Sequence, residues 1–395
     1  MAYDFDTVLC RTGTDSVKYS PSIARRMQPL LPDDFIPLWI ADMDFACPPE
    51  VLAAMHARLD RGILGYSAVE MPEYGALVSG WMRRRFGWDP DPGSLVLSAG
   101  VVQALETLVS LLAKPGEGVI LQPPVYGPFL RSILRAGCRP VESPLRDEGG
   151  GRYAMDFDDL ERKAADPSTT LLLLCSPHNP VGRVWREEEL RRMARICFDH
   201  GVRIVSDEIH ADLTRLGVRH VPLASLFPDD PRIATCTAPS KTFNLAGNAL
   251  AHVHLPDSDA RAAWECDHAH HPNPLSIAAV RAAYAQGDAW LDELRAYLDG
   301  NLARIGTVLA ERLPRAVYRV PEGTYLAWIG FPGTGLAGPE LLAVAARDAG
   351  LLLDCGERYV SHGEGWLRLN AACPRSLLDA ALDRFCRAFA PYAGG

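Results

Sequence analysis

Lys241 is the residue in the sequence whose type and setting most clearly indicate a chemical role. It stands in the stretch Ala-Pro-Ser-Lys-Thr-Phe-Asn (238–244), shortly after an apolar run at 233–235. The chain has only four lysines, so few other amines compete for a chemical role. A lysine amine can condense with an aldehyde and can later move a proton at carbon. A surface lysine is the alternative, but the tight turn after a strand favours a catalytic, cofactor-binding Lys241.

Asp207 and His210 belong to the segment Asp-Glu-Ile-His, which follows the apolar run at 202–206. A carboxylate at the C-terminal end of a parallel strand lies where open α/β folds bind ligands. Facing a pyridine nitrogen, it keeps that nitrogen protonated. We predict that Asp207 is catalytic and binds the cofactor, the alternative being a capping or solvent-facing carboxylate. His210 is predicted to contact the cofactor, and a structural histidine is an equal alternative.

Asn179 lies in the loop Ser-Pro-His-Asn-Pro-Val-Gly (176–182), which follows the apolar run at 171–174. The flanking prolines restrict the backbone. This suits an amide held against the phenolate oxygen of an aldehyde cofactor, and a turn without a ligand is the alternative. An amine, a carboxylate and an amide of this kind predict that the cofactor is pyridoxal 5′-phosphate (PLP) and that the substrate is an amino acid.

The phosphate of such a cofactor needs several hydrogen-bond donors. Gly100, Val101 and Val102 join a predicted strand at 95–97 to an amphipathic helix. A helix N-terminus offers free backbone N–H groups to an anion. This signal is weak by itself because such turns are common. Ser240 is a second candidate.

Tyr126 and Arg368 are candidates for contacts on the reacting side. Tyr126, in Pro-Pro-Val-Tyr-Gly-Pro-Phe, can stack on a flat ring. Arg368, in Trp-Leu-Arg-Leu-Asn, offers a fork for an α-carboxylate. A core tyrosine and a structural ion pair are the ordinary alternatives. We predict both residues to be catalytic.

The elements that position these residues follow an α/β pattern. Continuous apolar runs predict strands that are buried on both faces, as in a parallel sheet; they lie at 95–97, 119–121, 171–174, 204–205 and 233–235. The amphipathic stretch 187–200 predicts a helix between two of them. Strands alternating with helices indicate an α/β fold.

The pattern changes after residue 287. A long helix is predicted at 288–313, followed by strands near 317–320, 325–329 and 366–369 and by helices near 338–349 and 376–390. We therefore predict three parts: an N-terminal arm (1–49) packing on the small domain, a large PLP-binding domain (50–287) and a small C-terminal domain (288–395).

Composition excludes several classes of function. A net charge of −9 and a pI near 5.7 argue against nucleic-acid or anionic-membrane partners. Ten scattered cysteines without a CxxC pair argue against a disulfide framework. The first residues lack a basic, apolar signal segment, and no apolar run reaches the ~18 residues of a membrane span. A cytoplasmic location is therefore expected.

Together these segments resemble fold-type I PLP enzymes of the aspartate aminotransferase superfamily, and are most similar to the MalY/PatB-like cystathionine β-lyases (C–S lyases). The likeness runs nearly end to end. It includes the arm Trp-Ile-Ala-Asp-Met-Asp-Phe (39–45), Gly-Tyr (65–66), Pro-Val-Tyr (124–126), Cys-Ser-Pro-His-Asn-Pro-Val-Gly-Arg-Val-Trp (175–185), Asp-Glu-Ile-His-Ala-Asp (207–212), Ala-Pro-Ser-Lys-Thr-Phe-Asn (238–244) and Arg-Leu-Asn (368–370).

The resemblance implies the fold-type I fold and a homodimer with active sites shared between subunits. It implies that Tyr126 stacks on the cofactor ring and that Tyr66 reaches the phosphate of the neighbouring subunit's cofactor, which makes Tyr66 a catalytic and cofactor-binding candidate. We expect the substrate to contact Ala41 of the arm and Tyr325, together with Arg368 and Asn179.

Two departures from the family pattern bear on the reaction. Class I aminotransferases usually carry an arginine eight positions after the lysine, where this chain has Ala249, and this favours a lyase. The stretches 246–249 and 355–359 also differ from related lyases. The expected reaction is α,β-elimination from a cysteine thioether, either cystathionine or a bulkier S-conjugate, giving thiol, pyruvate and ammonia.

Other functions are compatible with the same sequence. The runner-up is an aminotransferase on the same scaffold, followed by an oxidative or decarboxylating relative acting on a specialised metabolite. A PLP-binding regulatory protein represents another class. The cluster Cys-Asp-His-Ala-His-His (266–271) contains metal-ligand residue types, but they are too bunched for a recognisable zinc spacing, so no metal is expected.

Overall fold

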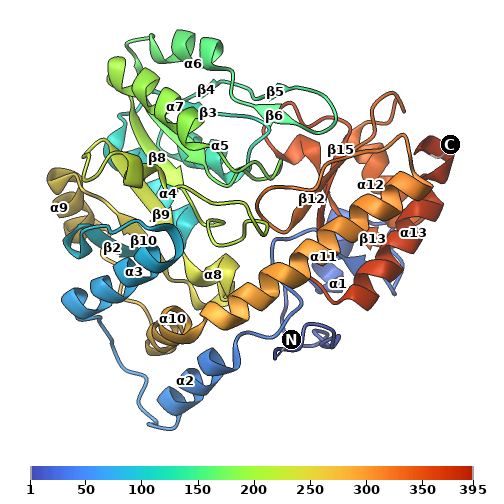
Figure 1. The fold of residues 1–395 in the computed structure, drawn as a ribbon, viewed down its shortest axis with the longest axis horizontal. Coiled ribbons are helices and arrows are strands. Elements are labelled where there is room, and N and C mark those ends of the chain that lie inside the picture. Colours follow the sequence, from blue (N-terminus) through green and yellow to red (C-terminus); the bar gives the residue numbers. More distant parts are fainter. Residues whose placement is uncertain (1, 394–395) are drawn as a thin grey trace.

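A seven-stranded mixed sheet forms the centre of the larger lobe in the computed structural model, which describes residues 2–393 (Figure 1). The strand order is β2-β10-β9-β8-β7-β3-β4, and only β10 runs antiparallel to its neighbours. The strands are β2 (Leu95–Ser98), β3 (Gly118–Leu121), β4 (Arg139–Glu142), β7 (Thr169–Cys175), β8 (Arg203–Asp207), β9 (Ile233–Thr237) and β10 (Ala251–His254). The predicted α/β class is confirmed.

Two strands of this sheet were not predicted from the sequence. β4 lies at the edge and carries polar, partly exposed residues, so it shows no apolar run. β10 reads Ala-His-Val-His, and both histidines are buried. Burial lowers the pKa of His252 to about 3 and that of His254 to about 4, so both rings are neutral at pH 7 and tolerate the core.

Helices cover both faces of the sheet. Leu171 and Leu173 face one core and Leu172 and Leu174 face the other, as expected when side chains alternate along a strand. The helices on the first face are α4 (Val101–Leu112), α5 (Pro128–Arg135) and α9 (Ser258–Asp267). The second core includes α2 (Pro49–Leu59), α3 (Met71–Phe86), α6 (Phe157–Ala164), α7 (Glu187–Asp199) and α10 (Pro274–Gln286).

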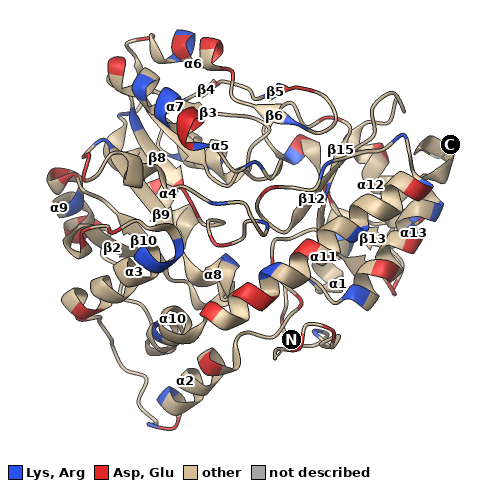
Figure 2. Ribbon diagram, viewed as in Figure 1, with Lys and Arg blue, Asp and Glu red and all other residues tan. Residues whose placement is uncertain are grey.

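A smaller antiparallel sheet organises the C-terminal lobe. Its order is β11-β12-β15-β14, with strands β11 (Val317–Tyr318), β12 (Leu326–Gly330), β14 (Asp354–Cys355) and β15 (Trp366–Asn370). Helices α12 (Gly338–Arg347) and α13 (Arg375–Ala393) pack against it around a core of their own. Basic and acidic residues are intermingled along the outer helices, including α7, α11 and α13 (Figure 2).

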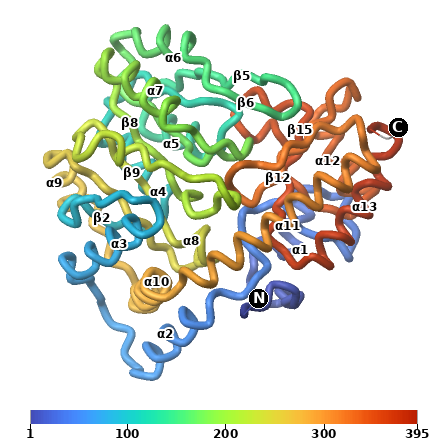
Figure 3. The backbone as a smooth tube through the Cα atoms, in the orientation of Figure 1, coloured from blue at the N-terminus to red at the C-terminus, as the bar shows by residue number. Residues whose placement is uncertain are grey.

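The middle of the N-terminal arm lies along this smaller lobe (Figure 3), whereas Phe5, Met43 and Phe45 pack in the core of the large lobe. It contains the short helix α1 (Pro21–Met27) and strand β1 (Ile36–Pro37), which pairs in parallel with β13 (Leu351–Leu352). Helix α11 (Asp288–Arg312) joins the lobes because Leu291 and Leu294 pack in the large-lobe core, whereas Ile305 and Leu309 pack in the other. The exact domain boundaries stay a prediction.

Among residues 2–393, no helix combines the length and apolar character needed to cross a bilayer.

Candidate active site

Three neighbouring strands deliver the main candidate residues to one edge of the large sheet. β7 ends at Cys175, ahead of the loop that carries Asn179, and β8 ends at Asp207. Cys175 and Asp207 are paired across these strands, and β9 leads into the short helix α8 (Pro239–Thr242) with Lys241. Because the carboxyl ends of parallel strands share an edge, residues separated by about 60 positions come together.

Lys241 is half-buried at this edge, and its Nζ donates a hydrogen bond to the carbonyl oxygen of Ala41 at 2.7 Å. Burial lowers the pKa of the amine to about 8; Asp42 and Asp207 oppose this effect, and Arg368 adds to it. An amine with such a pKa holds its proton weakly near neutral pH, which suits both condensation and proton transfer.

The neighbour of Lys241 anchors this turn. The hydroxyl of Thr242 donates to Asp212 Oδ2 at 2.8 Å, and Asp212 is itself buried. Trp81 donates its indole N–H to the same oxygen at 3.3 Å. Ser240 lies beside Lys241 in the same helical turn and is only partly buried.

Asp207 is buried, and its Oδ1 accepts the backbone N–H of Ile209 at 3.1 Å. Burial raises the pKa of this carboxyl to about 7, because the N–H of Ile209 and the charge of Lys241 compensate only in part. A cationic nitrogen placed against the carboxylate would restore its ionised form. His210 is also buried, its Nδ1 has no hydrogen-bond partner, and burial lowers the pKa of its ring to about 3.

Arg368 connects the small lobe to this edge. It is buried in the middle of β15, and its guanidinium donates to Asn179 Oδ1 at 3.1 Å and to the Trp39 carbonyl at 2.7 Å. Asp354 Oδ2, on the adjacent strand, lies 3.4 Å from Nη2. The Nε of Arg368 has no partner, so the fork retains a donor for a ligand.

Tyr126 reaches the site through the loop after β3. Its backbone N–H donates to the Asn179 carbonyl at 3.1 Å, and its ring is partly buried. Burial raises the pKa of the phenol, whereas the charge of Arg368 acts in the opposite direction. Tyr325 is fully buried, and its ring lies 6.3 Å from that of His210 in an edge-on arrangement.

The start of α4 is open. No side chain caps this helix, and a Cβ added to its N-cap residue, Gly100, would meet no atom within 4 Å. Val101 and Val102 open its first turn. This leaves space at a helix N-terminus for an anion.

Tyr66 is not brought to the other candidates within one chain. It lies in the exposed segment between α2 and α3, and its side chain is fully exposed. Ile63 and Leu64 in the same segment are 70% and 55% exposed. The predicted contact of Tyr66 with a neighbouring subunit therefore stays a prediction.

Sequence reasoning missed several residues at this site. Asp42 follows the Ala41 carbonyl that binds Lys241, and its carboxylate accepts from Arg11 at 2.7 Å. Asp354 accepts from the hydroxyl of Tyr359 at 2.8 Å, and the guanidinium of Arg368 lies 5.2 Å from the centre of the Tyr359 ring. Asp42 could have been found because it lies in the arm motif, but Asp354 gave no signal.

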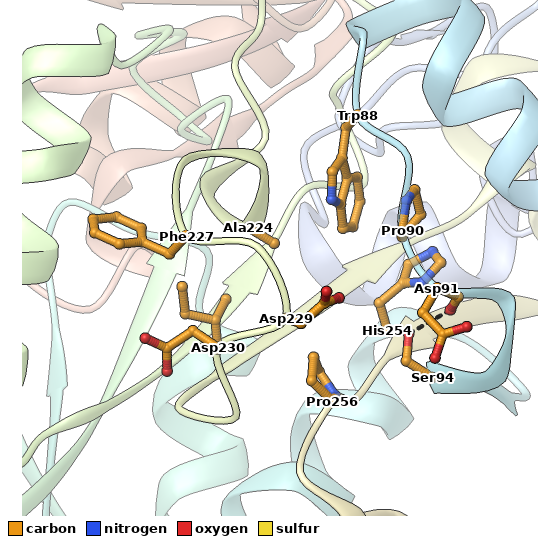
Figure 4. A pocket seen from close by; sticks show the side chains of 11 residues that line it. Trp88, Pro90, Asp91, Ser94, Ala224, Phe227, Asp229, Asp230, His254 and Pro256 are labelled. Carbon is orange, nitrogen blue, oxygen red and sulfur yellow. Dashed lines mark hydrogen bonds between the residues drawn. The ribbon is translucent and has the colours of Figure 1, made fainter.

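A separate pocket lies at the other end of the strands, away from the candidate site. Its lining includes Trp88, Asp91, Asp229 and the buried His254, whose ring lies 4.9 Å from that of Trp88 (Figure 4). His254 ends the antiparallel strand β10, and residues 229–230 lie shortly before the start of β9 at Ile233. The pocket is therefore at the amino end of the parallel strands and contains none of the predicted site residues.

The segment 266–271 lies at the end of α9 and beyond it. Cys266 is exposed, whereas His270 and His271 line a groove beside β2 with Val69 and Met71. In the described part of the chain, no three His, Cys, Asp or Glu side chains are arranged to hold a metal ion.

The site residues fit PLP. Lys241 presents an amine, Asp207 a carboxyl that a cationic nitrogen would ionise, and His210 a buried nitrogen without a partner. Gly100 leaves open space at a helix N-terminus, where a phosphate can bind.

Comparison with known proteins agrees with this geometry. Residues 33–385 match the family described as aminotransferase class I and II, and the chain belongs to this family. Cystathionine beta-lyase PatB of Bacillus subtilis is 40% identical over 96% of this chain and 98% of its own length. Protein MalY of Escherichia coli is 32% identical over 95% of this chain and 96% of its own.

The chain is also similar to a solved structure of a C–S lyase. The PLP-bound C–S lyase from Staphylococcus hominis is 33% identical, and the two structures superpose with a TM-score of 0.92 over 98% of each chain. The resemblance seen in the sequence and the fold-type I architecture are thereby confirmed.

Proposed function

We propose that the protein is a PLP-dependent carbon–sulfur β-lyase that cleaves cysteine thioethers. The observation that carries this proposal is the meeting of the Lys241 amine and the Arg368 guanidinium at one buried edge, joined by Asn179 and Asp207. The names of the relatives, a cystathionine beta-lyase and a C–S lyase, support the same reaction. Ala249, where aminotransferases usually have an arginine, also favours a lyase.

Arg368 binds the α-carboxylate of the substrate in this proposal. Its fork is held in place by the Trp39 carbonyl and Asn179 Oδ1. An arginine can bind a carboxylate through two parallel hydrogen bonds, which fixes the orientation of the carboxylate. This places Cα of the substrate toward the Lys241 side of the site.

Lys241 removes the proton from Cα. The low dielectric around its amine disfavours the ammonium form, so a useful fraction of the amine is free near pH 8. When bound, PLP supplies an aromatic ring that accepts the negative charge developing at Cα. Asp207 would keep its ring nitrogen protonated, and Asn179 would support its phenolate oxygen. His210 and Tyr126 would contact its ring, and Ser240 and the first turn of α4 would hold its phosphate.

Loss of the β-substituent as a thiolate completes the elimination. Overall, a cysteine thioether and one water give a thiol, pyruvate and ammonium. The test is incubation of the PLP-loaded enzyme with cysteine S-conjugates without any keto acid. Equal amounts of free thiol and pyruvate are expected. Turnover only after a keto acid is added, with the carbon–sulfur bond intact, would instead identify an aminotransferase.

The assembly proposed is a homodimer. The fully exposed Tyr66 and its exposed apolar neighbours Ile63 and Leu64 suit a surface that a second copy covers. Light scattering should give twice the chain mass, and Ile63→Asp should lower it. We also propose a cytoplasmic location, supported by ten cysteines that are all free thiols.

A further inference from the structure

Two half-exposed arginines flank the turn at Tyr126 and Gly127. Arg358 ends the short helix η4 (Gly356–Arg358) of the small lobe, and Arg131 lies on α5 of the large lobe. Their side chains are 51% and 53% exposed. Neither residue has a role in the reaction described above.

Backbone contacts bring both arginines to this turn. A Cβ added to Gly127 would lie 2.7 Å from the carbonyl oxygen of Arg358, so a glycine is needed for this close approach. The N–H of Val125 donates to the Tyr359 carbonyl at 3.0 Å. The N–H of Arg131 donates to the Gly127 carbonyl at 3.3 Å. The small lobe and α5 thus meet beside Tyr126.

The charges at this turn are incompletely balanced. Asp354 Oδ1 lies 3.2 Å from Arg358, but the other oxygen of Asp354 lies 3.4 Å from Arg368, so one carboxylate serves two arginines. Arg131 lies 3.9 Å from Glu106, which binds Arg135 more closely at 2.5 Å. Both exposed guanidiniums therefore keep donors for another anion.

Within the described residues, Asp354 is the one acid that pairs with Arg358, and Glu106 is the one acid that pairs with Arg131. Glu357 accepts the backbone N–H of Gly338 at 2.6 Å, and Glu142 accepts the hydroxyl of Ser361 at 2.6 Å. The charge of Arg131 also acts on Tyr126. Burial raises the pKa of the Tyr126 phenol, and the positive charges of Arg368 and Arg131 oppose this increase.

We propose that Arg358, assisted by Arg131, binds an anionic substituent on the substrate sulfur, so that preferred substrates are cysteine thioethers ending in a carboxylate. This rests on the proposed function, because it assigns the substrate class of the same site. Arg368 holds the α-carboxylate inside the site, and Arg358 holds the second carboxylate at its mouth.

The test compares two substrates of nearly equal shape, S-(2-carboxyethyl)-L-cysteine and S-(2-carbamoylethyl)-L-cysteine. We expect kcat/KM of the PLP-loaded enzyme to favour the acid. Arg358→Gln should lower kcat/KM for the acid by about 10-fold or more, the loss of one charge-assisted hydrogen bond, and change the amide less than about 2-fold. Arg131→Gln should give a smaller loss with the same selectivity. Arg347→Gln, at an arginine of similar exposure on α12, is the matched control.

A second measurement does not depend on turnover. The α-methyl derivatives of both compounds lack the Cα proton, so calorimetry reports their binding alone. Tighter binding of the acid than of the amide, abolished by Arg358→Gln, supports the proposal. Equal binding of the two, or an equal loss for both in the variant, overturns it. Absence of thiol release by the wild type, with the binding preference intact, would contradict the lyase function but not the anion site.

Discussion

The two halves of the site are built differently. On the large-lobe side, Asp207 ends a buried strand, and Asn179 and Lys241 follow within four residues of the ends of its two neighbours, β7 and β9. On the small-lobe side, Arg368 lies within a strand and is held by partners from three distant segments, represented by Trp39, Asn179 and Asp354. The first half is set by one sheet, whereas the second depends on how the lobes and the arm pack together.

This difference shows which changes should abolish chemistry and which should alter affinity. In the proposed reaction, groups on the large-lobe side bear on proton transfer, and groups on the small-lobe side position the substrate. Four variants test the two halves of the site and the contact between them.

Replacing Lys241 should have the largest effect. Lys241→Ala removes the amine that we propose moves the Cα proton, and we expect the rate of pyruvate formation to fall by at least about 10³-fold. The fold should survive, because the amine makes a single hydrogen bond, to Ala41. Borohydride treatment of the PLP-loaded wild type should label Lys241 and leave the variant unlabelled. Near-normal turnover in the variant would contradict the proposed role of Lys241 in proton transfer.

Asp207 should make the stability of the cofactor-free protein depend on pH. Its folded pKa, about 7, lies above the ordinary value of 3.8 for an aspartate, so between these pH values the folded chain holds a proton that the unfolded chain has released. The free energy of unfolding should therefore fall as pH rises through this window, by up to about 1.4 kcal/mol per unit from this group.

Denaturant unfolding at several pH values checks this expectation. Asp207→Asn should flatten the slope relative to the wild type, since the amide does not titrate. Added PLP should also flatten it, because a cationic ring nitrogen stabilises the carboxylate. An unchanged slope in the variant would show that other buried acids cause the dependence.

Arg368→Lys should weaken substrate binding more than it slows chemistry. The lysine keeps the charge but loses the fork, and the lost hydrogen bond to a charged group corresponds to about 1.5–3 kcal/mol. We expect kcat/KM for a cysteine S-conjugate to fall roughly 10- to 100-fold, mostly through KM. Arg384→Lys, on α13 and paired with Asp34, is the control and should change neither parameter.

Gly323 lies where the small lobe contacts the loop that carries Asn179, and its substitution tests this contact. A methyl group there would lie 2.7 Å from Pro177 Cβ and 2.9 Å from Val184 Cγ2, in the loop that carries Asn179. Gly323→Ala should lower the free energy of unfolding by about 1–3 kcal/mol through overpacking. Gly247→Ala, where a Cβ meets nothing within 4 Å, should have little effect on stability.

The sequence predicted the large-lobe half well because its signals are local. Each apolar run that was identified became a buried strand, and the polar residue after it lies at the sheet edge, as with Asp207 at the end of β8. β10 was missed because two histidines interrupt its apolar pattern, and only the core makes them neutral. The roles of the site residues and the domain boundaries remain predictions.

Asp354 shows where sequence reasoning stops. Nothing near it in the chain marks it as a site residue, and its importance comes from lying opposite Arg368 across two antiparallel strands. Tyr66 is the reverse case, since its motif was recognised but one folded chain leaves its side chain in solvent.

The order of apolar runs and reactive residues by itself determined the α/β architecture and the PLP cofactor, and it singled out Lys241 as the candidate amine. Only the tertiary structure decided that the Ala41 carbonyl binds Lys241, that Asp354 is shared by two arginines, and that Gly127 lets the small lobe approach Tyr126. The physical reason is the separation along the chain between the residues that interact. Strand formation depends on neighbouring residues, whereas burial, pKa shifts and shared ion pairs depend on segments that meet only when the lobes pack.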